Sequence, residues 1–97
     1  MKFSPETAQE ETQVLQSNGW ELNSQATELC KTFEFKNFVA AFGWMAQVAL
    51  LSEKANHHPE WSNVYKTVHV KLTTHDVGGL SQLDVDLAKQ MDRLAET

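Results

Sequence analysis

The middle of the chain holds an almost unbroken apolar stretch, which limits the possible folds more than any other feature. Residues 38–51 contain no proline and are interrupted only by Gly43 and Gln47, so we predict one long helix over about residues 37–55. A helix with one core-facing stripe would carry a polar back, so we expect this helix to cover a sheet with one side and a partner subunit with the other. Its apolar residues are Phe38, Val39, Ala40, Ala41, Phe42, Trp44, Met45, Ala46, Val48, Ala49, Leu50 and Leu51.

The length of the chain argues against enclosing this helix completely. We predict a single domain over residues 1–97, and a domain of that size buries only about 60 to 65% of the surface that its unfolded chain exposes. A fully buried central helix is therefore the less favoured alternative, and self-association is the favoured one. The stretch is also too short, and too closely followed by charged residues, to be a membrane span.

The charge balance argues against polyanionic partners. The formal net charge is −5, and no cluster of lysine and arginine offsets it locally, so we expect no direct contact with nucleic acid and none with a membrane. Cys30 is the only cysteine, which excludes an intramolecular disulfide and a thiolate-rich zinc site. Residues 1–5 lack the apolar run of a signal peptide, so we expect a cytoplasmic protein.

Shorter elements are predicted before the central helix. Ser4 followed by Pro5 indicates the start of a first helix, mostly exposed, which Asn18 and the following glycine end. Residues 20–22 and 29–35 then favour two short strands joined by a polar stretch. We expect these strands to form a β-hairpin.

A second pair of strands is predicted after the central helix, at residues 63–65 and 68–74. Val68, Val70 and Leu72 alternate with polar residues, which is typical of a strand with one buried face. Tight connections on both sides favour antiparallel pairing.

The last helix has a clear start and an apolar stripe. Ser81 and Asp84, three residues later, form a capping-box pattern after a glycine turn. Its predicted buried residues are Leu83, Leu87, Met91 and Leu94. The order of elements predicts a two-layer α+β fold, in which a four-stranded antiparallel sheet made of two hairpins carries its helices on one face.

Histidines at the ends of predicted elements are the candidate catalytic residues. His57 and His58 follow the central helix and precede Pro59, and His75 stands at the end of a strand, whereas His69 lies in mid-strand. Imidazole can give or take a proton near neutral pH, so several imidazoles around one pocket suit general acid/base catalysis.

Two other interpretations of these histidines stay open at this point. A metal site could recruit the carboxylates of Glu53, Asp76 and Asp84, but none of the usual short ligand spacings is present, so we predict no metal. The histidines could also be ordinary solvated residues. For the pair at residues 57–58 taken alone, this last interpretation is the stronger one.

The spacing of a longer set of residues changes that balance. The set is Glu53, His57, His58, Pro59, Tyr65, His75 and Asp84. This spacing resembles the signature of the pterin-4a-carbinolamine dehydratase family, and the surrounding sequence, such as Ala41-Phe42-Gly43-Trp44-Met45 and Pro59-Glu60-Trp61, is similar to that family as well. The resemblance covers about residues 20–88.

The resemblance implies a reaction that needs no cofactor. Water is lost from a 4a-hydroxytetrahydropterin, which gives the quinonoid dihydropterin and so recycles the cofactor of aromatic amino-acid hydroxylases. By similarity, His57 and His75 are the acid/base pair and His58 helps to hold the pterin ring. One departure is visible at Asn56, where family members often carry an acid, and this bears on the rate.

The same resemblance suggests which other residues border the substrate. Trp61 is either an apolar wall for the ring or a core aromatic. Glu53 and Asp84 are expected to orient imidazoles, although helix capping explains Asp84 equally well. The residues that would border the ring through main-chain groups are Pro59, Thr74, Asp76 and Val77.

The family also implies an assembly and an alternative function. Its members form dimers and tetramers, so we expect a homo-oligomer through residues 38–51 and a sheet edge. Animal relatives serve as dimerisation partners of a homeodomain transcription factor. The alternative is therefore a protein-binding dimerisation cofactor or coactivator that acts through the apolar helix without contacting DNA.

Overall fold

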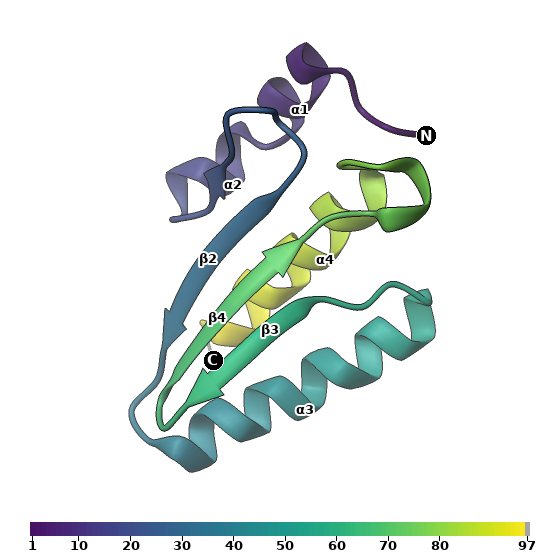
Figure 1. Cartoon of the computed structure of the whole chain (residues 1–97). Coiled ribbons are helices and arrows are strands. Elements are labelled where there is room, and N and C mark those ends of the chain that lie inside the picture. The colour runs from purple at the N-terminus through teal and green to yellow at the C-terminus, as the bar shows by residue number, and fades with distance from the viewer. Residues whose placement is uncertain (97) are drawn as a thin grey trace.

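The structure, a computed structural model, describes residues 1–96. Helices alternate with pairs of strands along the chain, in the order that the sequence predicts (Figure 1). The elements are α1 (Pro5–Glu11), α2 (Gln13–Ser17), β1 (Glu21–Leu22), β2 (Leu29–Glu34), α3 (Phe38–Ala55), β3 (Glu60–Val64), β4 (Thr67–Leu72), the 3-10 helix η1 (His75–Val77) and α4 (Gln82–Ala95).

One antiparallel sheet organises the molecule, with strand order β1-β2-β4-β3. β1 with β2 and β3 with β4 are the two predicted hairpins, and the pairing of β2 with β4 joins them. That central ladder runs from Leu29 opposite Leu72 to Glu34 opposite Thr67. The predicted α+β fold, with a four-stranded sheet of two hairpins, is confirmed.

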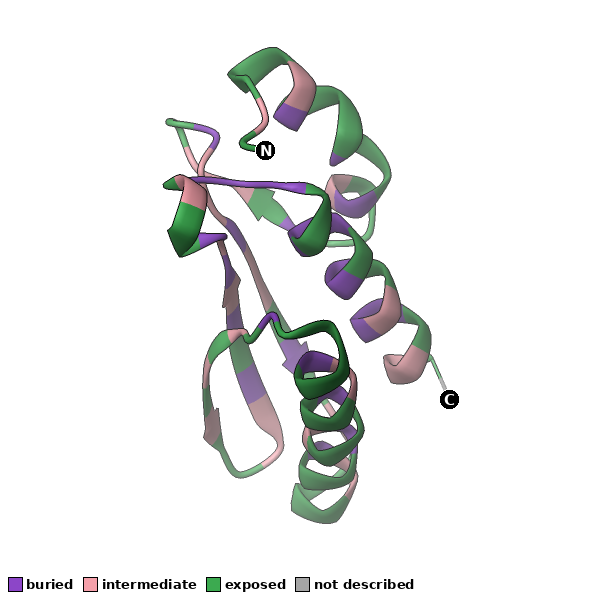
Figure 2. Cartoon of the chain, turned by 90° about the vertical axis from the view of Figure 1, so that its right-hand side faces the viewer, coloured by how far each residue is buried: buried purple, intermediate pink, exposed green. Residues whose placement is uncertain are grey.

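The helices α3 and α4 lie on the same side of the sheet, as the view in Figure 2 shows. Val68, Val70 and Leu72 all point toward that side and are buried. Successive strand residues point to opposite faces, so the residues between them point to the other face. The indole nitrogen of Trp44 in α3 donates a hydrogen bond to the carbonyl oxygen of Met91 in α4, at 3.1 Å. The core therefore lies between the sheet and these two helices, and no helix among residues 1–96 covers the other face of the sheet.

The long helix α3 has well-defined ends. The side chain of Asn37 accepts a hydrogen bond from the amide of Ala40 at 2.8 Å, which caps the amino end. Asn56 ends the helix in the left-handed conformation, with φ of 53°. The amide of His57 then donates to the carbonyl oxygen of Ser52 at 3.0 Å, which turns the chain toward the end of the sheet.

The apolar surface of α3 is divided between the core and the solvent side. Ala41, Trp44 and Val48 are buried against the sheet. Val39 and Leu50, on the other side, are 78% and 74% exposed, and Phe38 and Phe42 are also exposed. Within residues 1–96, no other element covers this surface. The amino-acid sequence predicted such an apolar side of the helix, facing away from the sheet.

Three details differ from the sequence prediction. The first helix is interrupted at Thr12, whose hydroxyl donates to the carbonyl oxygen of Ala8 at 2.6 Å. β3 begins at Glu60 and ends before Tyr65, which adopts a positive φ of 53° in the turn. The prediction that Leu83 is buried was wrong: it is 43% exposed, because it borders the surface hollows at this end of the molecule, whereas its neighbours Asp84 and Val85 are buried. Among residues 1–96, no helix is both long and apolar enough to span a membrane.

Candidate active site

Three histidines meet at one end of the molecule, around a pocket of about 260 Å³. His57 and His58 come from the segment after α3, and His75 begins η1 after β4. The chain brings these elements together because Thr74 forms a bridge with Gly79, which folds the segment after β4 back toward α4. The pocket is lined by Asn56, His57, His58, Thr73, Thr74, His75, Asp76 and Leu83.

The pair of His57 and Asp84 is the buried part of the site. The ring Nε2 of His57 lies 2.6 Å from Oδ1 of Asp84, and both side chains are almost inaccessible. The other carboxylate oxygen, Oδ2, accepts hydrogen bonds from the Thr74 hydroxyl at 2.7 Å and from the Ser81 amide at 3.0 Å. Asp84 therefore caps α4 with one oxygen and holds an imidazole with the other.

Two further histidine and carboxylate pairs lie at the surface. Nε2 of His58 is 2.9 Å from Oε1 of Glu53, and Nε2 of His75 is 2.7 Å from Oε2 of Glu60. The side chain of His75 is 77% exposed and that of Glu60 46% exposed. Both pairs are therefore surrounded by solvent, unlike the pair formed by His57.

All three imidazoles use the same ring nitrogen to contact a carboxylate. An ionised carboxylate can only accept a hydrogen bond, so each Nε2 is assigned as the proton-bearing nitrogen. This assignment leaves Nδ1 of each ring as the nitrogen that can exchange a proton with a ligand. The site thus combines three imidazoles, each in contact with a carboxylate, which is an arrangement suited to acid/base chemistry.

The structure separates the remaining predicted site residues into two groups. Thr74 and Asp76 line the pocket. Trp61 does not: its ring centroid is 6.2 Å from that of Trp44, so of its two interpretations the structure supports the core aromatic. Pro59 also lies outside the pocket lining, and Val77 faces a neighbouring hollow bordered by the amino-terminal residues.

Glu60 is the site residue that sequence reasoning missed. It follows the histidine pair in the Pro59-Glu60-Trp61 motif, and it starts a strand that pairs with the strand leading to His75. An antiparallel hairpin places the first residue of β3 beside the last residues of β4. Correct placement of the strand start would have put Glu60 at the same end of the sheet as His75, but the contact itself depends on the fold after β4. Among residues 1–96, no group of three histidine, cysteine or carboxylate side chains is arranged to hold a metal ion.

Solved structures with the same architecture define the class of protein. A crystal structure of a transcriptional coactivator/pterin dehydratase from Brucella melitensis matches with a TM-score of 0.89 and 38% identity, over 98% of this chain and 99% of that one. A pterin dehydratase-like protein that is a RuBisCO assembly factor in the α-carboxysome matches with a TM-score of 0.69 and 21% identity, over 81% and 92% of the two chains. At that identity the second match shows the fold alone. The fold is that of the pterin dehydratases.

Sequence comparison gives the family. The family model "Pterin 4 alpha carbinolamine dehydratase" matches residues 1–94. A protein of Jannaschia sp., provisionally named pterin-4-alpha-carbinolamine dehydratase, is 65% identical over 82 residues, which are 84% of each chain. A Roseobacter denitrificans protein with the same provisional name is 58% identical over 94 residues, 97% of this chain and 96% of the relative. The chain belongs to the pterin 4 alpha carbinolamine dehydratase family.

Proposed function

We propose that this protein dehydrates 4a-hydroxytetrahydrobiopterin, or pterin-4a-carbinolamine, to quinonoid dihydropterin in the cytoplasm. The observation that carries the proposal is the convergence of three imidazoles on one pocket, each held by a carboxylate. Membership of the family supports the substrate class. The reaction recycles the cofactor of aromatic amino-acid hydroxylases and requires no metal or cofactor in the dehydratase.

The reaction needs one proton donor and one proton acceptor. An imidazolium protonates the 4a-hydroxyl group, the bond from C4a to oxygen breaks, and water leaves. A neutral imidazole takes the proton from N5, and the electrons of the N5–H bond form the double bond between C4a and N5. Imidazoles suit both steps because they exchange protons near neutral pH.

We assign His57 and His75 as the acid/base pair because they reach the pocket from two different elements, one after α3 and one after β4. A flat ring bound between them would be accessible to both imidazoles. His58, held by Glu53, is proposed to help hold the ring, together with main-chain groups of residues 74–77. In this proposal Glu53 and Asp84 act through the histidines that they orient.

The presence of Asn56 in place of an acid does not change the assignment of His57 and His75 as the acid/base pair. It lines the pocket, but His57 has Asp84 as its partner and His75 has Glu60, so neither imidazole depends on an acid at position 56. We propose that the effect of Asn56 is limited to contacts with the ring. Asparagine also tolerates the left-handed conformation that ends α3.

Turnover of a 4a-hydroxytetrahydropterin, generated in situ by a pterin-dependent hydroxylase, tests the proposal. We expect dehydration above the uncatalysed rate, and loss of the enzymatic component in a variant that combines His57→Ala and His75→Ala. His69→Ala is the matched control, since His69 lies on the open face of the sheet and contacts Thr32. Wild-type turnover by the folded double variant would contradict the site assignment.

A homo-oligomer is the assembly that the exposed side of α3 favours. The rings of Phe38 and Phe42 lie 5.8 Å apart on that surface, and Val39 and Leu50 extend it. We propose a dimer or tetramer that forms through residues 38–51 and a sheet edge, because small domains gain stability by burying such surfaces. Native mass measurement of Leu50→Glu against the wild type tests this, with a smaller assembly expected for the variant.

The alternative function, a protein-binding cofactor or coactivator, would use the same surface. The similar Brucella melitensis protein, a transcriptional coactivator/pterin dehydratase, supports keeping this alternative. The two functions separate in Leu50→Glu. Turnover that survives when the variant loses its assembly supports the enzyme, whereas a stable heterologous complex broken by the same change, in a protein without turnover, supports the binding module.

A further inference from the structure

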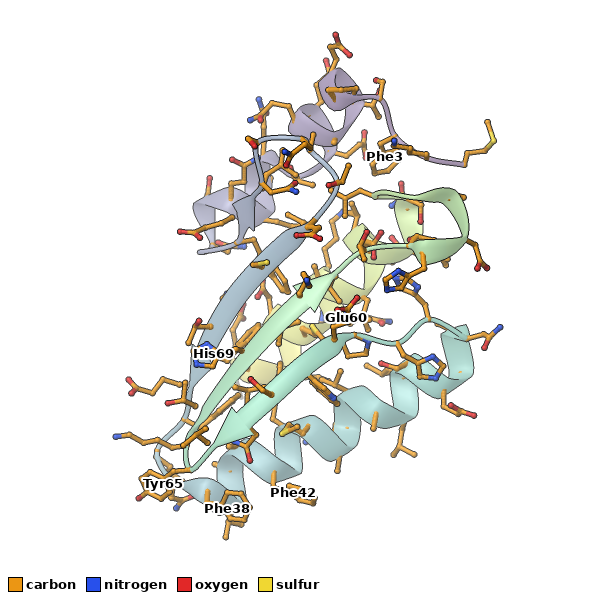
Figure 3. The ribbon with its side chains drawn as sticks, in the orientation of Figure 1. Phe3, Phe38, Phe42, Glu60, Tyr65 and His69 are labelled. Carbon is orange, nitrogen blue, oxygen red and sulfur yellow. The ribbon has the colours of Figure 1, made fainter. Side chains whose placement is uncertain are left out.

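We propose that Glu60 is the positioning residue for His75 in the reaction: it selects the tautomer of the imidazole and so makes Nδ1 the proton-exchanging nitrogen. The inference rests on the proposed dehydratase function. It starts from the 2.7 Å contact between Oε2 of Glu60 and Nε2 of His75. Figure 3 labels Glu60 at the start of β3, beside the end of β4.

His75 needs such a partner more than His57 does. Its side chain is 77% exposed, and it sits in η1, a single turn of three residues that ends at Gly78. Among residues 1–96, Glu60 is the hydrogen-bond partner of the His75 ring. A solvated imidazole without a partner samples several rotamers and both neutral tautomers, so only a fraction of molecules would present the correct nitrogen.

Glu60 is itself held in place from two directions. Its backbone pairs with Lys71 in the ladder of β3 and β4, which fixes the start of the strand. Its second oxygen, Oε1, lies 3.7 Å from Nζ of Lys71, and the same ammonium lies 3.8 Å from Oε2 of Glu28. Glu60 therefore directs Oε1 toward Lys71 of the sheet and Oε2 toward the ring of His75.

The chemistry of the carboxylate decides which nitrogen is available. Because Oε2 can only accept, Nε2 of His75 carries the proton in the neutral ring, and the lone pair is on Nδ1. When the ring takes the N5 proton of the pterin, that proton therefore lands on Nδ1.

Substitution of Glu60 by glutamine distinguishes selection of the His75 tautomer from mere contact with the His75 ring. Glu60→Gln keeps the size of the side chain but can offer either its oxygen or its NH₂ group to Nε2, so it no longer selects a tautomer. We expect kcat to fall by about tenfold while KM changes little. Glu60→Asp, which keeps a carboxylate, should recover part of the rate, and Glu28→Gln, which alters only the other partner of Lys71, should keep all of it.

The tautomer is measured directly, without turnover, by the ¹⁵N shifts of the His75 ring in labelled protein at a pH where the ring is neutral. The wild type should show a protonated Nε2, and Glu60→Gln a mixture of both tautomers. A merely structural role for Glu60 would lower the melting temperature without changing this ratio. An unchanged ratio together with an unchanged kcat in Glu60→Gln would overturn the inference while leaving the dehydratase function standing.

Failure of the proposed function has a different signature. A wild-type protein without turnover would overturn the dehydratase assignment, and with it the catalytic part of this inference. Turnover in the wild type, a kcat loss in Glu60→Gln and a mixed tautomer would support both.

Discussion

The buried and the exposed histidine pairs of this site differ in what they do for the molecule. His57 and Asp84 lie inside the protein, and Asp84 also accepts hydrogen bonds from the Thr74 hydroxyl and from the amide of Ser81, the N-cap of α4. His75 and Glu60 make an equally short contact at the surface. Removing a member of the buried pair leaves polar groups without partners, whereas solvent can replace either member of the exposed pair. The first pair thus links the site to the fold, and the second can change without unfolding the protein.

The largest expected effects come from the two histidines themselves. His57→Ala and His75→Ala should each lower kcat by about 100- to 1000-fold, because each removes one proton-transfer group. Their stabilities should differ: His57→Ala should lose about 2 kcal/mol, and His75→Ala less than about 0.5 kcal/mol. Turnover and urea unfolding of both variants measure this. Equal losses of stability would contradict the comparison.

Asp84→Ala tests the buried pair from its other side. The change removes the Asp84 half of the capping box of α4 and leaves His57, Thr74 and the Ser81 amide without their Asp84 acceptor, so we expect a loss of about 3 kcal/mol in unfolding free energy. Turnover should fall as well. The matched control is Asp86→Ala in the same helix, since Asp86 is exposed and its carboxylate accepts only from Gln82 among the described residues. A similar loss in both variants would mean that burial of Asp84 is not the cause.

A smaller effect is expected from pH. A general base must be neutral, and imidazole takes up a proton as the pH falls below neutrality, so kcat should fall about tenfold between pH 7.5 and pH 5. Circular dichroism at pH 5 checks that the protein is still folded. An undiminished rate in the folded protein would exclude a histidine base.

The smallest effect is expected on the open face of the sheet, away from both pairs. Burial raises the pKa of the Cys30 thiol, and the nearby carboxylate of Glu28 raises it further. A raised pKa leaves less thiolate at a given pH, so iodoacetamide at pH 8 should modify Cys30 several-fold more slowly than free cysteine. Cys30→Ser should leave turnover unchanged, and a loss of turnover would place chemistry on this face.

Local signals in the sequence predicted much of this fold. The cap at Ser4 and the capping box of Ser81 with Asp84 lie where the pattern puts them, because each depends on residues three or fewer positions apart. The alternation of Val68, Val70 and Leu72 likewise predicted the buried face of β4. The interruption at Thr12 and the exposure of Leu83 were not predicted. Leu83 fits the apolar stripe of α4, but it borders surface hollows that only the packing of distant segments creates.

The sequence by itself determined the order of the elements, the two hairpins, the apolar back of α3 and, through the spacing of its histidines and acids, the family. Only the tertiary structure decided which acid holds which imidazole, that Trp61 packs against Trp44, and that Glu60 reaches His75. The physical reason is the distance along the chain over which each interaction acts. Dihedral preferences and caps act over a few neighbouring residues, whereas the contact between Glu60 and His75, 15 positions apart, depends on the register of one hairpin and on where its strands begin.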